Sequence, residues 1–385
     1  MTEDKKLKIG VTCYHKAGGS GIVATELGMA LAARGHEIHF ISSSTPFRLT
    51  ESDNILLHRV ETADYPLFDY PPYTLALAVK MHQVVSFHDL DLLHVHYAIP
   101  HAASAILARD MGSWPVPVVT TLHGTDITLV GSHPSYHRIT RHCIEQSDAV
   151  TSVSEYLSKE TDRIFEAKKE VKVIPNFVDS DRFSPRENQD LRSKYARAEE
   201  KIILHASNFR PVKRVPFVLE IFDKLAMRDQ SILLLAGDGP DLSTVRRMAR
   251  ERNLEDRVHF LGACEDMETV FPLADLFLQP SEYESFGLAA LEAMSCGVPC
   301  LLTNQGGTAE FLHHGDNGCL LDPEDLDLWV KTAGRLLSSP LESREMGARA
   351  RDHAKRNFSL ERVVKQYEDL FLSLVPGFDN PRNFA

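Results

Sequence analysis

The stretch that decides the fold reads Ser281-Glu282-Tyr283-Glu284-Ser285-Phe286-Gly287-Leu288-Ala289-Ala290-Leu291-Glu292-Ala293-Met294. A strand-like segment, residues 274–280, runs directly into it. The stretch then changes from a polar loop into an apolar helix, with Gly287 in its first turn. A strand, a loop and a helix in this order are typical of a βα unit in a parallel sheet.

Two carboxylates in this stretch point to a binding site. Glu284 falls in the incoming loop and Glu292 about two turns into the helix, so both can face one cleft at the helix N-terminus. Unpaired backbone N–H groups and the positive end of the helix dipole bind anions there. A diphosphate on the helix, with hydroxyl groups on the two acids, suits a nucleotide sugar. A buried helix with two solvated glutamates is the plain alternative.

The rest of the chain is large enough for two domains. Its 385 residues are 43% hydrophobic and 25% charged, as in ordinary soluble globular proteins. The formal net charge of −12 argues against a general nucleic-acid surface. The N-terminal sequence is charged, and no apolar run approaches the roughly 20 residues of a membrane span. We therefore expect no leader, no membrane insertion and a cytoplasmic protein, in which six scattered cysteines stay reduced.

Strand-like and helical segments alternate almost throughout, which predicts two facing, doubly wound α/β domains. We expect an N-terminal domain at residues 1–175, a polar linker at 176–200, a second domain at 201–358, and a C-terminal helix at 359–385 that braces the first domain. Ligands of such sheets bind beyond the carboxyl ends of the strands, which here means the cleft between the domains. Expected strands are 7–13, 37–41, 55–60, 92–96, 116–121, 149–153, 171–174, 202–207, 232–236, 258–261, 276–279 and 299–303.

A glycine-rich turn follows the first expected strand. Gly19-x-Gly21-x-x-Ala24 formally fits the dinucleotide fingerprint. The second expected strand, however, ends Phe40-Ile41-Ser42-Ser43-Ser44, without the acid that binds a ribose. Nicotinamide or flavin binding is therefore the weaker alternative. The glycines still let backbone N–H groups approach an anion at the helix start, unless they only form a tight turn.

Cations and histidines stand at other expected strand ends. Arg210 and Lys213 follow the first strand of the second domain, where they can neutralise a departing diphosphate or simply be solvated. His123 can hydrogen-bond a sugar hydroxyl, and its carbonyl can face positive charge at an anomeric carbon. His94 and His96 share one strand face without a third ligand at suitable spacing, so we interpret them as a polar pocket wall and expect no metal. The sequence Asp89-Leu90-Asp91 precedes its strand and is interpreted as a surface turn.

Together these segments resemble the retaining nucleotide-sugar glycosyltransferases of family 4, whose GT-B fold has two facing Rossmann-like domains. The resemblance covers essentially the whole chain. It rests on the glycine loop 18–21, Ile174-Pro175-Asn176, Gly237-Asp238-Gly239-Pro240, and Glu284-x7-Glu292 followed by Ala293-Met294-Ser295-Cys296-Gly297-Val298-Pro299. It implies an enzyme that needs no cofactor and no metal.

The resemblance also implies a role for each matching residue. Glu292 holds the ribose hydroxyls, Glu284 contacts the donor hexose, and uracil is read near Gly262. Backbone amides around Gly287 receive the phosphates, and His123 approaches the donor sugar at its reacting face. The implied catalytic residues are His123, Arg210, Lys213 and Glu284, and the implied donor-binding residues are Gly19, Gly262, Ala263, Phe286, Gly287, Leu288 and Glu292.

Three segments, 16–28, 94–101 and 121–128, are similar to one branch of this family. That branch transfers N-acetylglucosamine from UDP-N-acetylglucosamine to the hydroxyl of L-malate, the first step of bacillithiol biosynthesis. Phe177 departs from the wider family, in which glycine is frequent at this position. Because malate is a small dianion, we expect its pocket to offer hydrogen-bond donors. The candidates are Ser20, Tyr97, Thr121 and Asn176, each at an expected strand end of the first domain.

The implied reaction retains the anomeric configuration, with the donor phosphate itself accepting the proton of the malate hydroxyl. Other readings stay open at this point. They are a family 4 enzyme with a sugar, inositol phosphate or lipid acceptor, a UDP-N-acetylglucosamine 2-epimerase, and a non-catalytic nucleotide-sugar-binding protein. The sequence says nothing of the oligomeric state, and a homo-oligomer is compatible with it.

Overall fold

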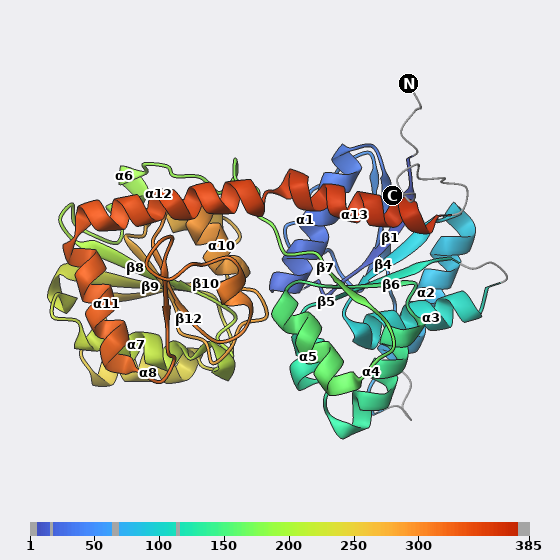
Figure 1. Cartoon of the computed structure of the whole chain (residues 1–385), viewed down its shortest axis with the longest axis horizontal. Helices are drawn as coiled ribbons and strands as arrows, with labels where there is room; N and C mark the ends of the chain where they lie inside the picture. Colours follow the sequence, from blue (N-terminus) through green and yellow to red (C-terminus); the bar gives the residue numbers. More distant parts are fainter. Residues whose placement is uncertain (1–5, 16–17, 64–68, 113–115, 376–385) are drawn as a thin grey trace. The chain divides into compact units, whose positions relative to one another are not determined.

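The chain folds into two compact units, each built on a parallel sheet. The computed structural model describes residues 6–15, 18–63, 69–112 and 116–375. The first unit comprises Met1–Pro175 with Glu361–Ala385, and the second comprises Asn176–Leu360. In Figure 1 each unit has a central sheet with helices outside it. The predicted fold class, two Rossmann-like α/β domains, is confirmed.

The sheet of the first unit contains, among the described residues, seven parallel strands in the order β3-β2-β1-β4-β5-β6-β7. Its central strands are almost wholly buried because helices cover both faces. The strands are β1 (Lys8–Thr12), β2 (Glu37–Ser42), β3 (Ile55–Arg59), β4 (Leu92–His96), β5 (Val118–Leu122), β6 (Ala149–Ser152) and β7 (Val171–Val173).

Helices of the first unit begin and end at residues with a clear local cause. Gly35, with φ of +92°, follows the last turn of α1. Asp89, with φ of +53°, ends α2, and the Ser154 hydroxyl accepts the Leu157 amide at 3.1 Å to cap α5. The elements are α1 (Gly19–Ala33), α2 (Tyr73–His88), α3 (Ala103–Asp110), α4 (Pro134–Gln146), α5 (Glu155–Phe165) and the turns η1 (Ala98–Ala102) and η2 (Thr125–Leu129).

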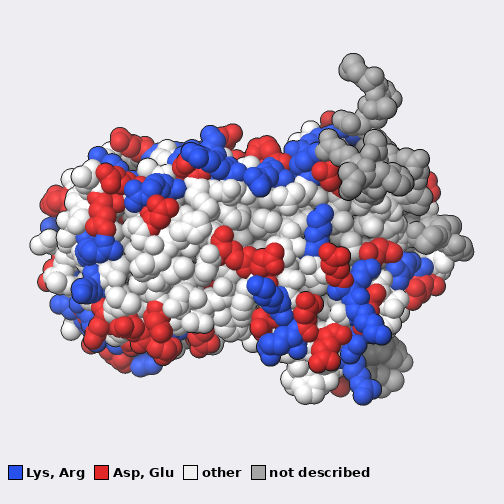
Figure 2. Space-filling model, viewed as in Figure 1, with Lys and Arg blue, Asp and Glu red and all other residues white. Residues whose placement is uncertain are grey.

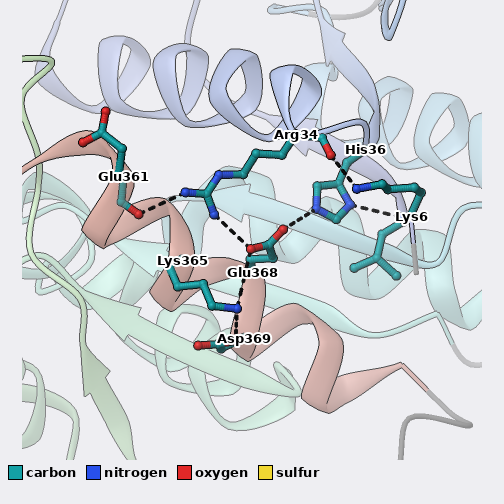
Figure 3. A network of polar contacts seen from close by, with 8 residues as sticks. Lys6, Arg34, His36, Glu361, Lys365, Glu368 and Asp369 are labelled. Atoms are coloured by element: carbon teal, nitrogen blue, oxygen red, sulfur yellow. Dashed lines mark hydrogen bonds and ion pairs between the residues drawn. The ribbon is translucent and has the colours of Figure 1, made fainter. Parts of the chain in front are cut away.

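The C-terminal helix α13 (Leu360–Leu374) packs on the first unit, and its Glu368 carboxylate contacts residues at the end of α1. Glu368 accepts from Arg34 Nη1 at 3.0 Å and contacts His36 Nε2 at 3.0 Å, as Figure 3 shows. Arg34 also reaches the Glu361 carbonyl, and Lys6 bonds the Arg34 carbonyl at 2.7 Å. Burial would raise the pKa of Glu368, but His36 and Arg34 outweigh it and lower that pKa.

The sheet of the second unit has six parallel strands among the described residues, in the order β10-β9-β8-β11-β12-β13. The indole of Trp329 is fully buried in its core and donates to the Asp322 carbonyl at 2.8 Å, so the one polar atom of this side chain is satisfied. The strands are β8 (Lys201–Ala206), β9 (Ser231–Ala236), β10 (Val258–Gly262), β11 (Leu276–Gln279), β12 (Cys300–Thr303) and β13 (Cys319–Leu321).

Helices surround this second sheet as well. The longer ones are α7 (Val215–Lys224), α8 (Leu242–Glu251), α10 (Leu288–Ser295), α11 (Leu326–Ser338) and α12 (Pro340–Asn357), and the shorter ones are α6 (Gln189–Arg192), α9 (Met267–Val270), η3 (Pro211–Lys213), η4 (Arg228–Gln230), η5 (Phe271–Leu273) and η6 (Gly307–Glu310).

The segment expected as a linker groups with the second unit instead of standing apart. It forms α6, and Arg192 binds Asp275, just before β11, at 2.9 Å. Val178 bridges to Ser359, next to the start of α13. These contacts attach residues 176–200 to the second sheet, and a polar composition did not reveal them.

On the face drawn in Figure 2, Lys and Arg side chains are interspersed with Asp and Glu. Within the described residues, no helix combines the length and the apolar character needed to span a bilayer.

Candidate functional site

Four loops lie at the carboxyl edge of the second sheet, after β8, β9, β10 and β11. Two glycines let the β9 loop pass against the β8 loop. A Cβ on Gly237 would lie 1.8 Å from the Ser207 carbonyl oxygen, and one on Gly239 would lie 2.1 Å from that of Asn208. The Gly237-Asp238-Gly239-Pro240 turn is therefore required by close backbone approach.

An ion pair joins two of the predicted site residues. Lys213 Nζ lies 2.7 Å and 2.8 Å from the two carboxylate oxygens of Glu284. The Ser281 hydroxyl donates to the same carboxylate at 2.6 Å, and Gln279 Nε2 donates to it as well. Glu284 is 5% exposed. The pair thus presents a fixed arrangement of charge beside the β11 loop.

The pKa of Glu284 is set by two opposing effects, its burial and its interactions with neighbouring side chains. Burial would raise it, but the Lys213 charge and the hydrogen bonds from Lys213, Ser281 and Gln279 outweigh burial and lower the pKa. Glu284 is therefore ionised at neutral pH. Its backbone is fixed too, because the Gly307 amide donates to the Glu284 carbonyl at 2.8 Å.

Helix α10 starts one residue later than we expected. Gly287 is its N-cap, with φ of +110°, and Leu288 is the first helical residue, so Glu292 lies about one turn in and not two. The helix start has no side-chain cap and no acid in its first turn, which leaves its backbone N–H groups for an anion. The Phe286 ring is buried and stacks on Phe311 with centroids 5.0 Å apart. It therefore contributes to a site only through its backbone.

The cations of the η3 loop differ in their surroundings. Arg210, at the N-cap of η3, is exposed. Arg214 donates to the Pro323 carbonyl, and its guanidinium lies 4.4 Å from the centre of the Phe217 ring. The Arg214 side chain therefore interacts with Pro323 and Phe217, whereas Lys213 forms an ion pair with Glu284.

Gly262 ends β10, the outer strand of this sheet, and Ala263 follows it. The Gly262 carbonyl accepts the Gly237 amide at 2.7 Å, which joins the β9 and β10 loops. Gly262 has φ of +70°, and a Cβ there would meet open space. The two residues lie at the same edge of the sheet as Glu284.

In the first unit, three predicted segments meet at the carboxyl edge of the sheet, after β1, β4 and β5. Helix α1 begins at Gly19 with Gly18 as its N-cap, so Ser20 is its second residue. This helix start also has no side-chain cap and no acid in its first turn. Lys16 and Ala17 of the glycine loop lie outside the described residues.

Histidine side chains from the ends of β4 and β5 form one cluster. His96 Nδ1 lies 2.8 Å from His123 Nε2, and the His101 ring bonds the His96 carbonyl. The Tyr97 ring lies beside the cluster, 5.4 Å from the His123 centroid. The Nε2 atoms of His96 and His101 are buried with no hydrogen-bond partner among the described residues. These two nitrogens are unused polar groups next to Tyr97.

Burial holds this cluster neutral. It lowers the pKa of His94 and of His123 to about 3 and that of His101 to about 4. The His123 side chain is therefore an uncharged imidazole at neutral pH.

Thr121 is buried inside β5 and not at its open end. Its hydroxyl lies 2.8 Å from His94 Nε2, 2.7 Å from the Thr151 hydroxyl and 3.4 Å from that of Tyr367 in α13. Its predicted contact with an acceptor would therefore be indirect.

Asn176 corrects one expectation. It was placed with the first domain, but it groups with the second unit. It is buried, and its Oδ1 lacks a hydrogen-bond partner within the described part of the chain. It follows Pro175, at which the first unit ends, so the strand-end pattern misassigned it by one residue.

Comparison with known proteins identifies the family. The profile "Glycosyltransferase Family 4" matches residues 17–182, and the profile "Glycosyl transferases group 1" matches residues 187–353. The chain is also 47% identical over 372 residues to the N-acetyl-alpha-D-glucosaminyl L-malate synthase of Bacillus anthracis, covering 96% of this chain and 98% of that protein.

This chain is a family 4 glycosyltransferase.

Solved structures agree on the fold of this glycosyltransferase. Sucrose-phosphate synthase from Thermosynechococcus elongatus superposes with a TM-score of 0.82 at 23% identity, over 96% of this chain and 99% of that one. HepE of Anabaena, solved with UDP and glucose, superposes with a TM-score of 0.80 at 20% identity, over 96% of this chain and all of that one. At these identities the likeness shows the GT-B fold alone.

Sequence reasoning missed several residues that shape the glycosyltransferase site. Asp126 is buried, and its carboxylate accepts the amides of Ala98, His123 and Gly124 at 3.0–3.1 Å, which ties the β4 and β5 loops together. Burial raises the pKa of Asp126 to about 6. An acid two residues after the strand-end pair His123-Gly124 was the available signal. Ser281 and Gln279 orient Glu284 by donating hydrogen bonds to its carboxylate, and the only sequence signal for them was that they lie close to Glu284 in the chain.

Proposed function

We propose that this glycosyltransferase transfers N-acetylglucosamine from UDP-N-acetylglucosamine to the hydroxyl of L-malate, the step that begins bacillithiol biosynthesis. The observation that carries the proposal is the 47% identity, over nearly all of both chains, to a relative named N-acetyl-alpha-D-glucosaminyl L-malate synthase.

In this proposal the second unit binds the donor. The diphosphate lies at the start of α10, on the amides of Phe286, Gly287 and Leu288. The absence of a side-chain cap and of a first-turn acid in this described helix supports this placement. Lys213 and Arg210 add positive charge where negative charge accumulates on the departing UDP. Because Glu284 fixes the Lys213 ammonium, little reorganisation is needed when that charge develops.

Residues at the same carboxyl edge of the second sheet also contact the sugar and the base of the donor. Glu292 accepts the ribose hydroxyls, Glu284 accepts a hexose hydroxyl, and backbone groups of Gly262 and Ala263 face uracil. Two buried acceptors nearby, Gln279 Oε1 and Asn208 Oδ1, lack hydrogen-bond partners among the described residues. Such atoms suit a ligand rich in hydroxyl groups.

The reaction proceeds with retention and without a metal. The bond between the anomeric carbon and the donor phosphate oxygen breaks as the malate oxygen bonds the anomeric carbon on the same face. The departing phosphate oxygen takes the malate proton, so the products are the glycoside and UDP. The neutral His123 stays at the donor sugar, where its carbonyl faces the positive charge developing on the anomeric carbon.

The first unit binds malate in this proposal. One malate carboxylate lies on Ser20 at the uncapped start of α1, next to Gly19, which contacts the donor, and Tyr97 donates a further hydrogen bond to malate. Thr121 acts through His94, which its hydroxyl contacts. Asn176, although it groups with the second unit, supplies an amide from its position directly after Pro175.

The test is UDP release from UDP-N-acetylglucosamine with and without L-malate, each in the presence of a chelator, with mass and NMR analysis of the product. We expect malate-dependent release, an α-configured glycoside and no effect of the chelator. Release without any acceptor would instead indicate an epimerase or hydrolase. Release only with another sugar or a lipid acceptor would overturn the malate assignment.

The acceptor residues have a separate test. We expect Ser20→Ala and Asn176→Ala to raise the KM for malate by about tenfold, since each removes one hydrogen bond to a charged ligand. Ser86→Ala, on α2 of the first unit, is the matched control and should change nothing. An unchanged KM in both site variants would remove these residues from the acceptor site.

A further inference from the structure

A second group of histidines lies in the first unit, apart from the residues of the proposed reaction. His39 is in β2, His58 in β3 and His88 is the last residue of α2. One ring nitrogen from each lies within 4.8 Å of the other two. His39 is fully buried, whereas His58 and His88 are half-buried. This is a compact set of three imidazoles.

The strand register and the end of α2 create this arrangement. Ile41 pairs with His58, so His58 lies diagonally across from His39 on the same face of the sheet. The neighbouring Phe40 contacts Gly28 of α1 on the other face. Asp89 then ends α2 in a left-handed conformation, directly after His88. The three rings pack with centroids 4.5–5.1 Å apart.

A carboxylate orients the buried member of the set. His39 Nε2 lies 2.8 Å from Glu37 Oε1, and His39 Nδ1 lies 2.9 Å from His58 Nε2. When Nε2 donates to Glu37, the Nδ1 lone pair faces the other two imidazoles. A carboxylate bound to the outer nitrogen of a histidine in this way is the usual outer-shell partner of a metal ligand.

Charged groups of both signs lie around the set. Lys8 and Lys80 oppose a cation here, and Glu37 is the negative charge beside His39.

We propose that His39, His58 and His88 bind a divalent transition-metal ion, with zinc as the intended occupant. Imidazole nitrogens suit zinc, and two nitrogens on one zinc lie about 3.3 Å apart when each bond is about 2.0–2.1 Å. The nitrogen separations in the set, from 2.9 Å between His39 and His58 up to 4.8 Å, include that value. A surface hollow bordered by His58, Lys80 and His88 gives the ion access and leaves the fourth position to water.

The site links β2, β3 and α2, away from the residues of the proposed reaction. His88 leads through Asp89 into the start of β4, whereas the proposed acceptor loops follow the carboxyl ends of β1, β4 and β5. The metal therefore stabilises the edge of the first sheet without touching the reaction. The chain binds this ion even if its acceptor is not malate.

The first experiment measures metal binding by the full chain after chelation and dialysis. We expect one zinc per chain, a raised melting temperature, and a visible d–d absorption when Co²⁺ is bound in its place, as tetrahedral nitrogen ligation gives. Fewer than one bound ion per chain, or Co²⁺ without that absorption, would overturn the proposal.

Variants then locate the ion. His58→Ala and His88→Ala should each weaken zinc binding by about tenfold or more, and Glu37→Gln by about tenfold through its loss as an outer-shell partner. His82→Ala, a histidine of the same helix and the same hollow, is the matched control and should bind zinc like the wild type. Equal losses in the His82 and His88 variants would assign the ion to the open surface and contradict the site.

Transferase activity keeps this inference separate from the proposed function. His88→Ala should retain the malate-dependent UDP release of the wild type, because His88 lies outside the proposed reaction. If a variant folds poorly, the nitrogen ligands can be counted by X-ray absorption of the zinc-loaded wild-type chain. Three imidazoles are expected, and one or none would refute the site.

Discussion

The two units place polar groups at the carboxyl edges of their sheets in opposite ways. The first unit buries neutral imidazoles, in which His96 contacts His123 at 2.8 Å and burial lowers the pKa of His123 to about 3. The second unit buries a charge, Glu284, and compensates it with Lys213 at 2.7 Å. A buried group must lose its charge or be paired. The two edges show both solutions on one chain.

This difference matches the chemistry proposed for each unit. A leaving diphosphate needs fixed positive charge, and a lysine held by a carboxylate offers it without reorganisation. An acceptor hydroxyl needs neutral hydrogen-bonding partners near a sugar, and uncharged imidazoles provide them. Changing the charge at either sheet edge tests whether this difference matters for the reaction and for stability.

The largest effect should come from the charged edge. Lys213→Met removes the ammonium proposed to stabilise the diphosphate and leaves Glu284 buried without its cation, so kcat should fall by about 10²–10³-fold. Steady-state UDP release measures this. Arg214→Gln is the matched control, because Arg214 bonds the Pro323 carbonyl and should change kcat little. Equal losses in both variants would show that only the loop conformation matters.

The next effect concerns acid stability, which should distinguish the units. The folded pKa values of His94 and His123, about 3, lie below the ordinary 6.5. The stability that they contribute is therefore complete above pH 6.5 and is lost as the pH falls toward 3. Each adds a slope of about 1.4 kcal/mol per pH unit. His101, with its pKa lowered to about 4 by burial, adds a third slope of the same sign. Asp126, with a folded pKa of about 6, acts in the opposite direction between pH 6 and 3.8 and cancels one of the three slopes, so two remain.

The second unit has fewer such groups. His205, with its pKa lowered to about 4 by burial, contributes one similar slope, and Glu284 acts only below pH 4.5. Proteolysis at neutral and mildly acidic pH, with the fragments mapped by mass spectrometry, should show the first unit cleaved earlier on acidification. Earlier cleavage of residues 176–360 would contradict the comparison.

The alternation of strands and helices predicted the fold because each βα unit has its own local signal. Strand β13 and helices α5, α6, α9, α11 and α12 were not named from the sequence. The position of Glu284, Gly287 and Glu292 at the carboxyl edge of the second sheet could be predicted for the same reason, since the three residues lie in one continuous stretch. The Lys213–Glu284 pair was not, because 71 residues separate its members and their contact depends on β8 lying beside β11.

The histidine set of β2, β3 and α2 could not be predicted from the sequence either, for the same reason as the Lys213–Glu284 pair. His39, His58 and His88 have no motif spacing, and only the register of β2 with β3 and the end of α2 bring them together. The sequence drew attention instead to His94 and His96, which are two residues apart in one strand and for which no third ligand was evident at suitable spacing. A site formed by residues from three separate elements can be recognised only once the fold is known.

A smaller effect should follow from the start of α10. Gly287→Ala puts a side chain at φ of +110° and a Cβ 3.3 Å from the Phe311 ring, which should cost about 1–3 kcal/mol and raise the KM for the donor. Gly315→Ala is the control, because it has φ of +82° with open space around its Cβ. Thermal unfolding should show a loss in both, and only Gly287→Ala should change donor KM. A normal KM in that variant would remove the helix start from the donor site.

The smallest effect should come from α13. Glu368→Gln weakens the contacts to Arg34 and His36, so unfolding free energy should fall by about 0.5–1 kcal/mol. Asp369→Asn, which breaks only the exposed pair with Lys365, should be nearly neutral. Denaturant unfolding compares them, and a larger loss for Asp369→Asn would show that Glu368 does not anchor the helix.

The assignment of the donor to the second unit and of the acceptor to the first is tested most directly by hydrogen–deuterium exchange with the ligands added in turn. UDP alone should protect the second unit at residues 284–292 and around Lys213. L-malate added with UDP should extend protection to the first unit, at residues 18–21 and 97–101. Protection of residues 18–21 by UDP alone, with residues 284–292 unchanged, would contradict the assignment of the donor to the second unit.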